Sequence, residues 1–183
     1  MSTPAASVRE AVQGLAFRHG EDVVVEVCVA LLDGADPEPH GEVALGLSRH
    51  DLGFEELRAA GFRDYWWPTW GARGLLYVWR PEAAPAVVRG IGHDHWRPAE
   101  MCLKVAAQRE IAEAAGGAVG LTGHDLARVR AVAVRTLGLV GDTEHVAVVR
   151  AALEDPDAQV RRAAGLALER MVGRLDLPEK ELP

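Results

Sequence analysis

Residues 155–168 read Asp-Pro-Asp-Ala-Gln-Val-Arg-Arg-Ala-Ala-Gly-Leu-Ala-Leu, and this stretch decides the fold. The pair Asp155-Pro156 ends a preceding helix, because the residue before a proline avoids the helical region of backbone space. The stretch has an earlier copy, in which Val129-Arg130 corresponds to Val160-Arg161, Ala133 to Ala164 and Leu137 to Leu168. The constant offset between the two copies indicates one unit of a helical repeat.

The same period extends along the rest of the chain. Gly92-His93-Asp94 recurs one period later as Gly123-His124-Asp125, and residues 94–98 resemble residues 64–68 at nearly the same spacing. His19 and His50 are also one period apart. A period of 30–31 residues with helical patterning predicts a solenoid of helix pairs, in which each pair buries its apolar face against its neighbours.

The sequence predicts first helices of the pairs near 4–18, 38–49, 68–80, 98–115, 126–140 and 157–173. Second helices are expected near 21–32, 53–61, 82–91 and 143–153. A weak segment at 117–122 follows Gly116 and contains Gly117 and Gly120, so it is expected to be a short helix or a loop. For the helix at 126–140, Asp125 is the predicted N-terminal cap and Gly141 the predicted end.

The pattern in residues 155–168 resembles HEAT repeats, most closely those of phycobilisome-lyase-type proteins. The resemblance is good over 92–173, moderate over 62–91 and faint over 1–61. It implies an all-α fold, a right-handed α-solenoid of about five to six helix pairs. We expect residues 1–174 to form a single domain of this kind and residues 175–183 to form a C-terminal tail.

Composition limits the class of protein. The chain has 183 residues, 49% of them hydrophobic, and a formal net charge of −7, which suits a soluble globular domain. No apolar run is long enough to span a membrane, and no signal peptide is visible. Two cysteines, Cys28 and Cys102, favour a reducing compartment, so we expect a cytoplasmic protein. Residues 1–64 carry a net charge of −7, equal to that of the whole chain, whereas residues 128–174 carry a net charge of +2.

The five tryptophans lie within residues 66–96, and three of them, Trp66, Trp67 and Trp70, lie at or just before the start of the helix predicted near 68–80. Packing between repeats explains such a cluster, because aromatic side chains usually fill cores. Neighbours in sequence point to different faces of a helix, however, so at least one of the three is expected to be exposed. An exposed tryptophan beside Arg73 has the composition of a binding hot spot.

The histidines recur with the repeat, which explains His93 and His124 without a metal ion. Adjacent helices are about 10 Å apart, too far for these two side chains to share one ion with ligand bonds of about 2 Å. Deoxyhypusine hydroxylases, which are HEAT enzymes, bind two irons through His-Glu pairs, and this chain contains no His-Glu dipeptide. We predict neither a metal ion nor a cofactor.

Basic residues also recur with the period of the repeat. Arg58 and Arg89 lie on second helices, where Gly120 interrupts the series, and Arg73, Lys104 and Arg135 lie on first helices and are expected to point outward. Both series are explained if these residues lie on solvated helix faces and form salt bridges. The functional alternative is that they line a groove that binds an anionic partner. DNA glycosylases of the alkylation-repair class also consist of HEAT-like repeats, but a chain of net charge −7 binds phosphates poorly.

These observations predict a non-catalytic protein-binding or adaptor module with no catalytic residue. The predicted partner surface consists of Trp66, Trp67, Trp70, Arg73, Arg89 and Trp96. The alternative is a HEAT-type enzyme, either a DNA glycosylase of the alkylation-repair class or a lyase-type enzyme. A protein partner is favoured over a nucleic acid, no membrane association is expected, and self-association into a homo-oligomer stays open.

Overall fold

The structure is a computed structural model and describes residues 7–177. It divides into two compact units, Met1–Gly90 and Ile91–Pro183. Both are built from helices alone in the part of the chain that the structure describes, and successive helices pair, which confirms the predicted all-α repeat-solenoid class. Among these residues no helix combines the length and the apolar character that crossing a membrane requires.

The first unit contains six α-helices and two 3-10 turns within its described residues. They are α1 (Val8–His19), α2 (Glu21–Leu32), the turn Glu38–His40, α3 (Gly41–Ser48), α4 (Phe54–Ala59), α5 (Trp66–Gly74), the turn Pro81–Ala83 and α6 (Ala84–Gly90). Helix α2 is the centre of this unit, because it packs against α1, α3, α5 and α6. Its buried side chains include Val24, Cys28 and Leu31.

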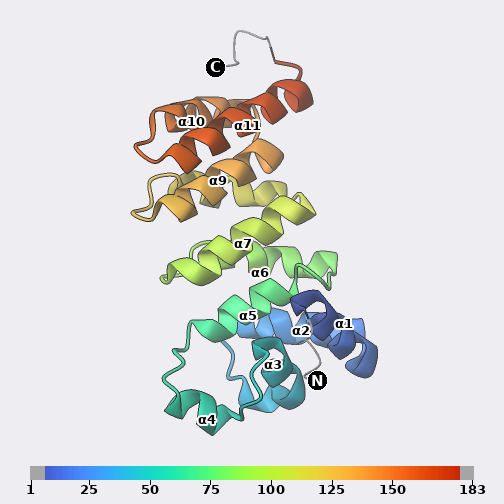
Figure 1. Cartoon of the computed structure of the whole chain (residues 1–183). Coiled ribbons are helices and arrows are strands. Elements are labelled where there is room, and N and C mark those ends of the chain that lie inside the picture. The colour runs from blue at the N-terminus through green and yellow to red at the C-terminus, as the bar shows by residue number, and fades with distance from the viewer. Residues whose placement is uncertain (1–6, 178–183) are drawn as a thin grey trace, which may run out of the picture. The chain divides into compact units, whose positions relative to one another are not determined.

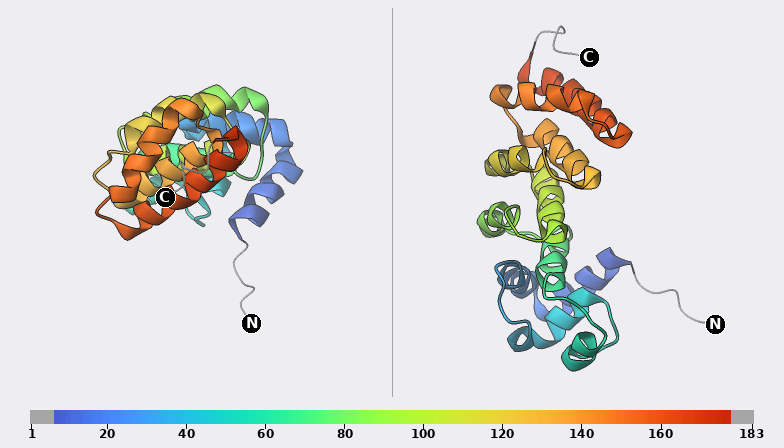
Figure 2. Two further views of the ribbon diagram at one scale, coloured as in Figure 1. Left: turned by 90° about the horizontal axis from the view of Figure 1, so that it is seen from above. Right: turned by 90° about the vertical axis from the view of Figure 1, so that its left-hand side faces the viewer.

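The second unit contains five α-helices in its described part. They are α7 (Trp96–Arg109), α8 (Ala115–Leu121), α9 (Ala127–Val140), α10 (Val146–Ala151) and α11 (Ala158–Leu175), with 3-10 turns at Ala112–Ala114, Thr143–His145 and Ala152–Glu154. Helices α7, α9 and α11 lie side by side in one layer, and α8 and α10 form the other (Figures 1 and 2). Helices α9 and α11 approach closely, since a Cβ atom on Gly138 would lie 2.7 Å from the Cα of Ala167.

The turns before α7, α9 and α11 each contain the same kind of hydrogen bond, from a backbone N–H to a side chain two residues earlier. The Nδ1 atoms of His93 and His124 accept the amide N–H groups of His95 and Leu126, each at 2.9 Å. At the third turn the carboxylate of Asp155 accepts the N–H of Asp157 at 2.8 Å. The repeated histidines therefore form the same side-chain turn that aspartate forms in the last repeat.

Several boundaries differ from those predicted, and the largest difference in the first unit is that the helix expected at 68–80 runs from Trp66 to Gly74 as α5. The cap of α9 is Leu126 instead of Asp125, because the turn is closed by His124, whereas Gly141 ends the helix as predicted. Helix α7 ends at Arg109 instead of continuing to residue 115, since Glu110 adopts a left-handed conformation with φ of 53°. Residues 117–121 of the weak segment belong to a short helix, α8, and Thr122 is its C-terminal cap. The tail predicted from residue 175 lies mostly outside the described residues.

Candidate functional site

The three tryptophans of α5 pack together with aromatic residues of the preceding loop. Trp66 stacks on Trp70 with ring centroids 5.9 Å apart, and Trp67 meets Trp70 edge to face at 4.9 Å. Trp70 is only 2% exposed and also contacts Phe62 and His50. Trp66 and Trp67 are partly buried and Trp70 is buried, so the expectation that at least one of the three is exposed is wrong. Ring-on-ring packing at these distances explains how three nearby indoles are covered.

The two arginines of the predicted surface in the first unit bind other helices of that unit. Arg73 donates from Nη2 to the carbonyl oxygen of Leu47 at 2.7 Å and so links α5 to the end of α3. Burial lowers the pKa of Arg73 from its ordinary value. Arg89 forms a forked pair with Asp33, in which Nη2 donates to both carboxylate oxygens at 3.0 and 2.8 Å. Both guanidinium groups therefore have partners within the first unit.

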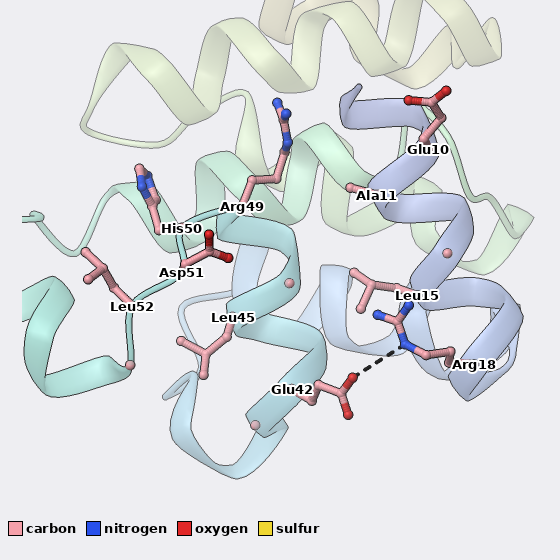
Figure 3. Close-up of a pocket in the computed structure, with 14 residues that line it drawn as sticks. Glu10, Ala11, Leu15, Arg18, Glu42, Leu45, Arg49, His50, Asp51 and Leu52 are labelled. Carbon is pink, nitrogen blue, oxygen red and sulfur yellow. Dashed lines mark ion pairs between the residues drawn. The ribbon is translucent and has the colours of Figure 1, made fainter. Parts of the chain in front are cut away.

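A cleft that sequence reasoning did not find lies between α1 and α3 (Figure 3). Its volume is about 990 Å³. Charged side chains of both signs surround it: Glu10 and Arg18 from α1, Glu42 from α3, and Arg49 and Asp51 from the loop that follows α3. Arg18 and Glu42 face each other across one end, with Nε and Oε1 3.4 Å apart.

The floor of this cleft is formed by small and apolar residues. Gly14 of α1 and Gly46 of α3 both line it, together with Leu15 and Leu45. A Cβ atom at Gly46 would lie 2.7 Å from Cδ2 of Leu15, so glycine is what lets α1 lie against α3 here. At Gly14 a Cβ atom would meet only Nη1 of Arg18, at 3.5 Å, so the floor is open on that side.

The aromatic cluster of α5 supports one wall of the cleft. His50 lines the cleft and rests edge to face on Phe62 with ring centroids 4.6 Å apart, while Trp70 lies 5.8 Å away on another side. Phe54, which follows the cleft-lining Gly53, contacts Trp67 at 5.6 Å. The structure thus brings Trp66, Trp67 and Trp70 together beside this wall, whereas Arg73 of the same helix contacts Leu47 of α3. The recurrence of His50 with the repeat was the only sequence signal near it.

Trp96 belongs to the second unit and has a different environment. The guanidinium carbons of Arg97 and Arg128 lie 4.4 and 4.7 Å from the centre of its ring. Arg128 also donates from Nη2 to both carboxylate oxygens of Glu100, at 3.0 and 2.9 Å, and Nζ of Lys104 lies 2.9 Å from the same carboxylate. Burial would raise the pKa of Glu100, but the hydrogen bonds from Lys104 and Arg128 outweigh it and lower that pKa, so the carboxyl group is ionised at neutral pH.

The other titratable groups are distributed through the fold. Within residues 7–177 no three His, Cys, Asp or Glu side chains lie close enough together to hold a metal ion. The two thiols are buried, and burial raises the pKa of Cys28 to about 12 and that of Cys102 also upward.

Comparison with known families gives a match to part of the chain. The model for HEAT repeats matches residues 119–180, which contain α9, α10 and α11. HEAT repeats generally mediate protein interaction. No curated protein matches the chain. The match supports the HEAT resemblance for the C-terminal part of the chain, where the sequence pattern is clearest, and the phycobilisome-lyase subtype stays a prediction.

Proposed function

We propose that this protein is a non-catalytic protein-binding module that receives a segment of a partner protein in the cleft between α1 and α3. Trp66 and Trp67 are the aromatic anchors of the neighbouring surface in this proposal. The observation that carries it is an open cleft with a leucine and glycine floor and charges of both signs on its rim. The HEAT match over residues 119–180 agrees with such a role.

The chemistry of the cleft suits a peptide segment. A helix or an extended strand binds in a groove by placing apolar side chains on the floor and polar groups on the rim. Leu45 is partly exposed on the floor, and backbone is accessible at Gly14 because no side chain covers it. Arg49 and Asp51 stand at the opposite side from Arg18, so a bound segment meets charges along both edges.

The test fills the cleft without disturbing the core. Gly14→Leu places a side chain over the floor, where the only atom near its Cβ is the flexible end of Arg18. The matched control is Gly116→Leu in α8, where no atom lies within 4 Å of an added Cβ. Leucine is a better helix former than glycine, so both variants are expected to fold at least as stably as the wild type.

Each protein is immobilised and used to capture proteins from an extract of the native source, with quantification by mass spectrometry. We expect a set of proteins captured by the wild type and by Gly116→Leu but not by Gly14→Leu. Trp67→Ala is expected to weaken the same captures. Equal capture by the two glycine variants would refute the cleft as the binding site, and no capture above an unrelated protein would refute the function itself.

A further inference from the structure

In the second unit, basic residues lie mostly on three helices, whereas acidic residues lie mostly outside those helices. The three helices α7, α9 and α11 together carry ten Arg and Lys residues and only two acidic ones, Glu100 and Glu169. The remaining acids of residues 91–177 occupy turns, caps and 3-10 segments, where short carboxylate side chains satisfy backbone N–H groups. A unit that is slightly acidic in sum therefore has a basic layer of helices.

Five of these cations lie along α7, α9 and α11 and define what we call the basic face: Arg97, Lys104, Arg128, Arg135 and Arg162. Arg128 and Lys104 cover the carboxylate of Glu100, whose side chain is only 6% exposed while that of Arg128 is 56% exposed. One buried negative charge thus lies beneath two cations that reach the solvent. Arg135 and Arg162 are exposed and form no ion pair with a carboxylate in residues 7–177.

The basic face also contains an apolar contact point. A hollow of about 400 Å³ lies between α9 and α11, and it is lined by Arg135, Gln159, Arg162, Ala163 and Leu166. Leu166 is 42% exposed, one of the few large apolar side chains of the described chain that reach the solvent to this degree. The hollow therefore combines two guanidinium groups with an apolar floor.

We propose that the basic face is a contact surface for an acidic amphipathic segment of a partner protein. Carboxylates of the segment pair with Arg128, Lys104, Arg135 and Arg162, and one apolar side chain enters the hollow beside Leu166. The proposal goes beyond the cleft between α1 and α3, because it concerns the other unit and a partner of defined charge. Either surface can fail its test without affecting the other.

Charge favours a peptide over a nucleic acid at this surface. Acidic turns flank the helices at residues 94, 125 and 155–157, and Glu110 and Asp176 follow the ends of α7 and α11. A long polyanion would extend from the basic face over these carboxylates, whereas a short segment ends at the edge of the face. The apolar hollow adds a contact that a phosphate backbone cannot use.

The size of the face determines the probe. Three helices with axes about 10 Å apart span roughly 20 Å, the length of an α-helix of about 14 residues. The probe is a fluorescein-labelled peptide of about this length, with glutamate and leucine on adjoining helical faces. A peptide with glutamine in place of every glutamate and a DNA duplex of equal total charge are the comparison ligands.

Binding is measured by fluorescence anisotropy on the full chain at low and at physiological salt. We expect saturable binding of the acidic peptide that weakens as salt is added, and a Kd at least about tenfold higher for Arg162→Glu. Leu166→Gln is expected to weaken binding without changing its salt dependence. The control Arg63→Glu makes the same change of charge at an exposed site of the first unit and should leave the Kd unchanged.

Four results would overturn the proposal: no binding of the acidic peptide, equal binding of the glutamine peptide, equal loss in Arg162→Glu and Arg63→Glu, or tighter binding of the duplex. Circular dichroism and thermal unfolding establish that each variant is folded. Gly14→Leu is included as well, and we expect it to bind the acidic peptide like the wild type.

Discussion

Removal of the Arg130 side chain tests how consecutive repeats of the second unit are held together. Arg130 donates from Nε and Nη2 to the two carboxylate oxygens of Asp155 at 2.7 and 2.8 Å, and from Nη1 to the carbonyl oxygens of His124 and Asp125 at 2.9 and 3.1 Å. It therefore joins the turn before α9 to the turn before α11. The side chains of Arg130 and Asp155 are 13% and 10% exposed, so water replaces these bonds poorly.

The repeat supplies the control for this experiment. Arg161 occupies the position of Arg130 in the next repeat and donates to the carbonyl oxygens of Asp155 and Pro156 at 2.7 and 2.9 Å, but to no carboxylate within residues 7–177. Hydrogen bonds of charged groups contribute about 1.5–3 kcal/mol, and the contribution is smaller for Arg161, because it is exposed to water and lacks the carboxylate partner that Arg130 has. We expect Arg130→Ala to lower the free energy of unfolding by about 2–3 kcal/mol and Arg161→Ala by about 1 kcal/mol.

Urea unfolding followed by circular dichroism measures both values, and Arg130→Lys separates charge from geometry. Lysine keeps the charge but lacks the planar fork, so it should recover only part of the loss. Pairing with Arg130 lowers the pKa of Asp155, so the stabilisation is present above the unfolded pKa of about 3.9 and is lost as the pH falls through the folded value. The difference between wild type and Arg130→Ala should therefore shrink from pH 6 to pH 3. An Arg130→Ala cost no larger than that of Arg161→Ala would refute the reasoning.

Three further predictions concern packing and reactivity. Trp70→Ala should lower the free energy of unfolding by about 3–5 kcal/mol, measured by urea unfolding, because the indole is buried at the centre of the α5 cluster. Gly138→Ala should lower the melting temperature, because the new Cβ atom would overlap α11, whereas Gly165→Ala, which meets no atom within 4 Å, should raise it. Cys28 and Cys102 should react with iodoacetamide at pH 8 only after unfolding, since burial raises the pKa of both thiols, and mass spectrometry of the labelled protein measures this.

The repeat period predicts the second unit well for a local reason. His93, His124 and Asp155 stand at the same position of three successive repeats, and each accepts the N–H of the residue two positions later. A turn of this kind depends only on neighbouring residues, so its spacing in the sequence is its spacing in the fold. The outward direction predicted for Lys104 and Arg135 follows from the same register, and both side chains reach the solvent.

The candidate sites are less visible in the sequence because they depend on contacts between distant residues. Nothing near Gly14 indicates that α1 approaches α3, and this approach requires Gly46 to have no side chain where Leu15 lies. Arg73 belongs to the same series as Lys104 and Arg135, yet it reaches the carbonyl oxygen of Leu47 because α3 ends beside α5 in the first unit. Sequence spacing determines which face of a helix a residue occupies, but the neighbour it meets depends on the packing of the helices.

The charge of −7 therefore has a narrower meaning than the composition suggests. At physiological salt, exposed charges separated by more than about 8 Å are largely screened from one another. The basic face spans roughly 20 Å, so a ligand bound on it is close to some charges of the face and screened from distant ones. A ligand on that face consequently responds mainly to the charges of the face itself, among them Arg128, Arg135 and Arg162. Net charge argues against a ligand that extends over the whole surface, such as a nucleic acid duplex, and does not argue against a short acidic segment. The salt dependence of peptide and duplex binding to the same face distinguishes these two cases.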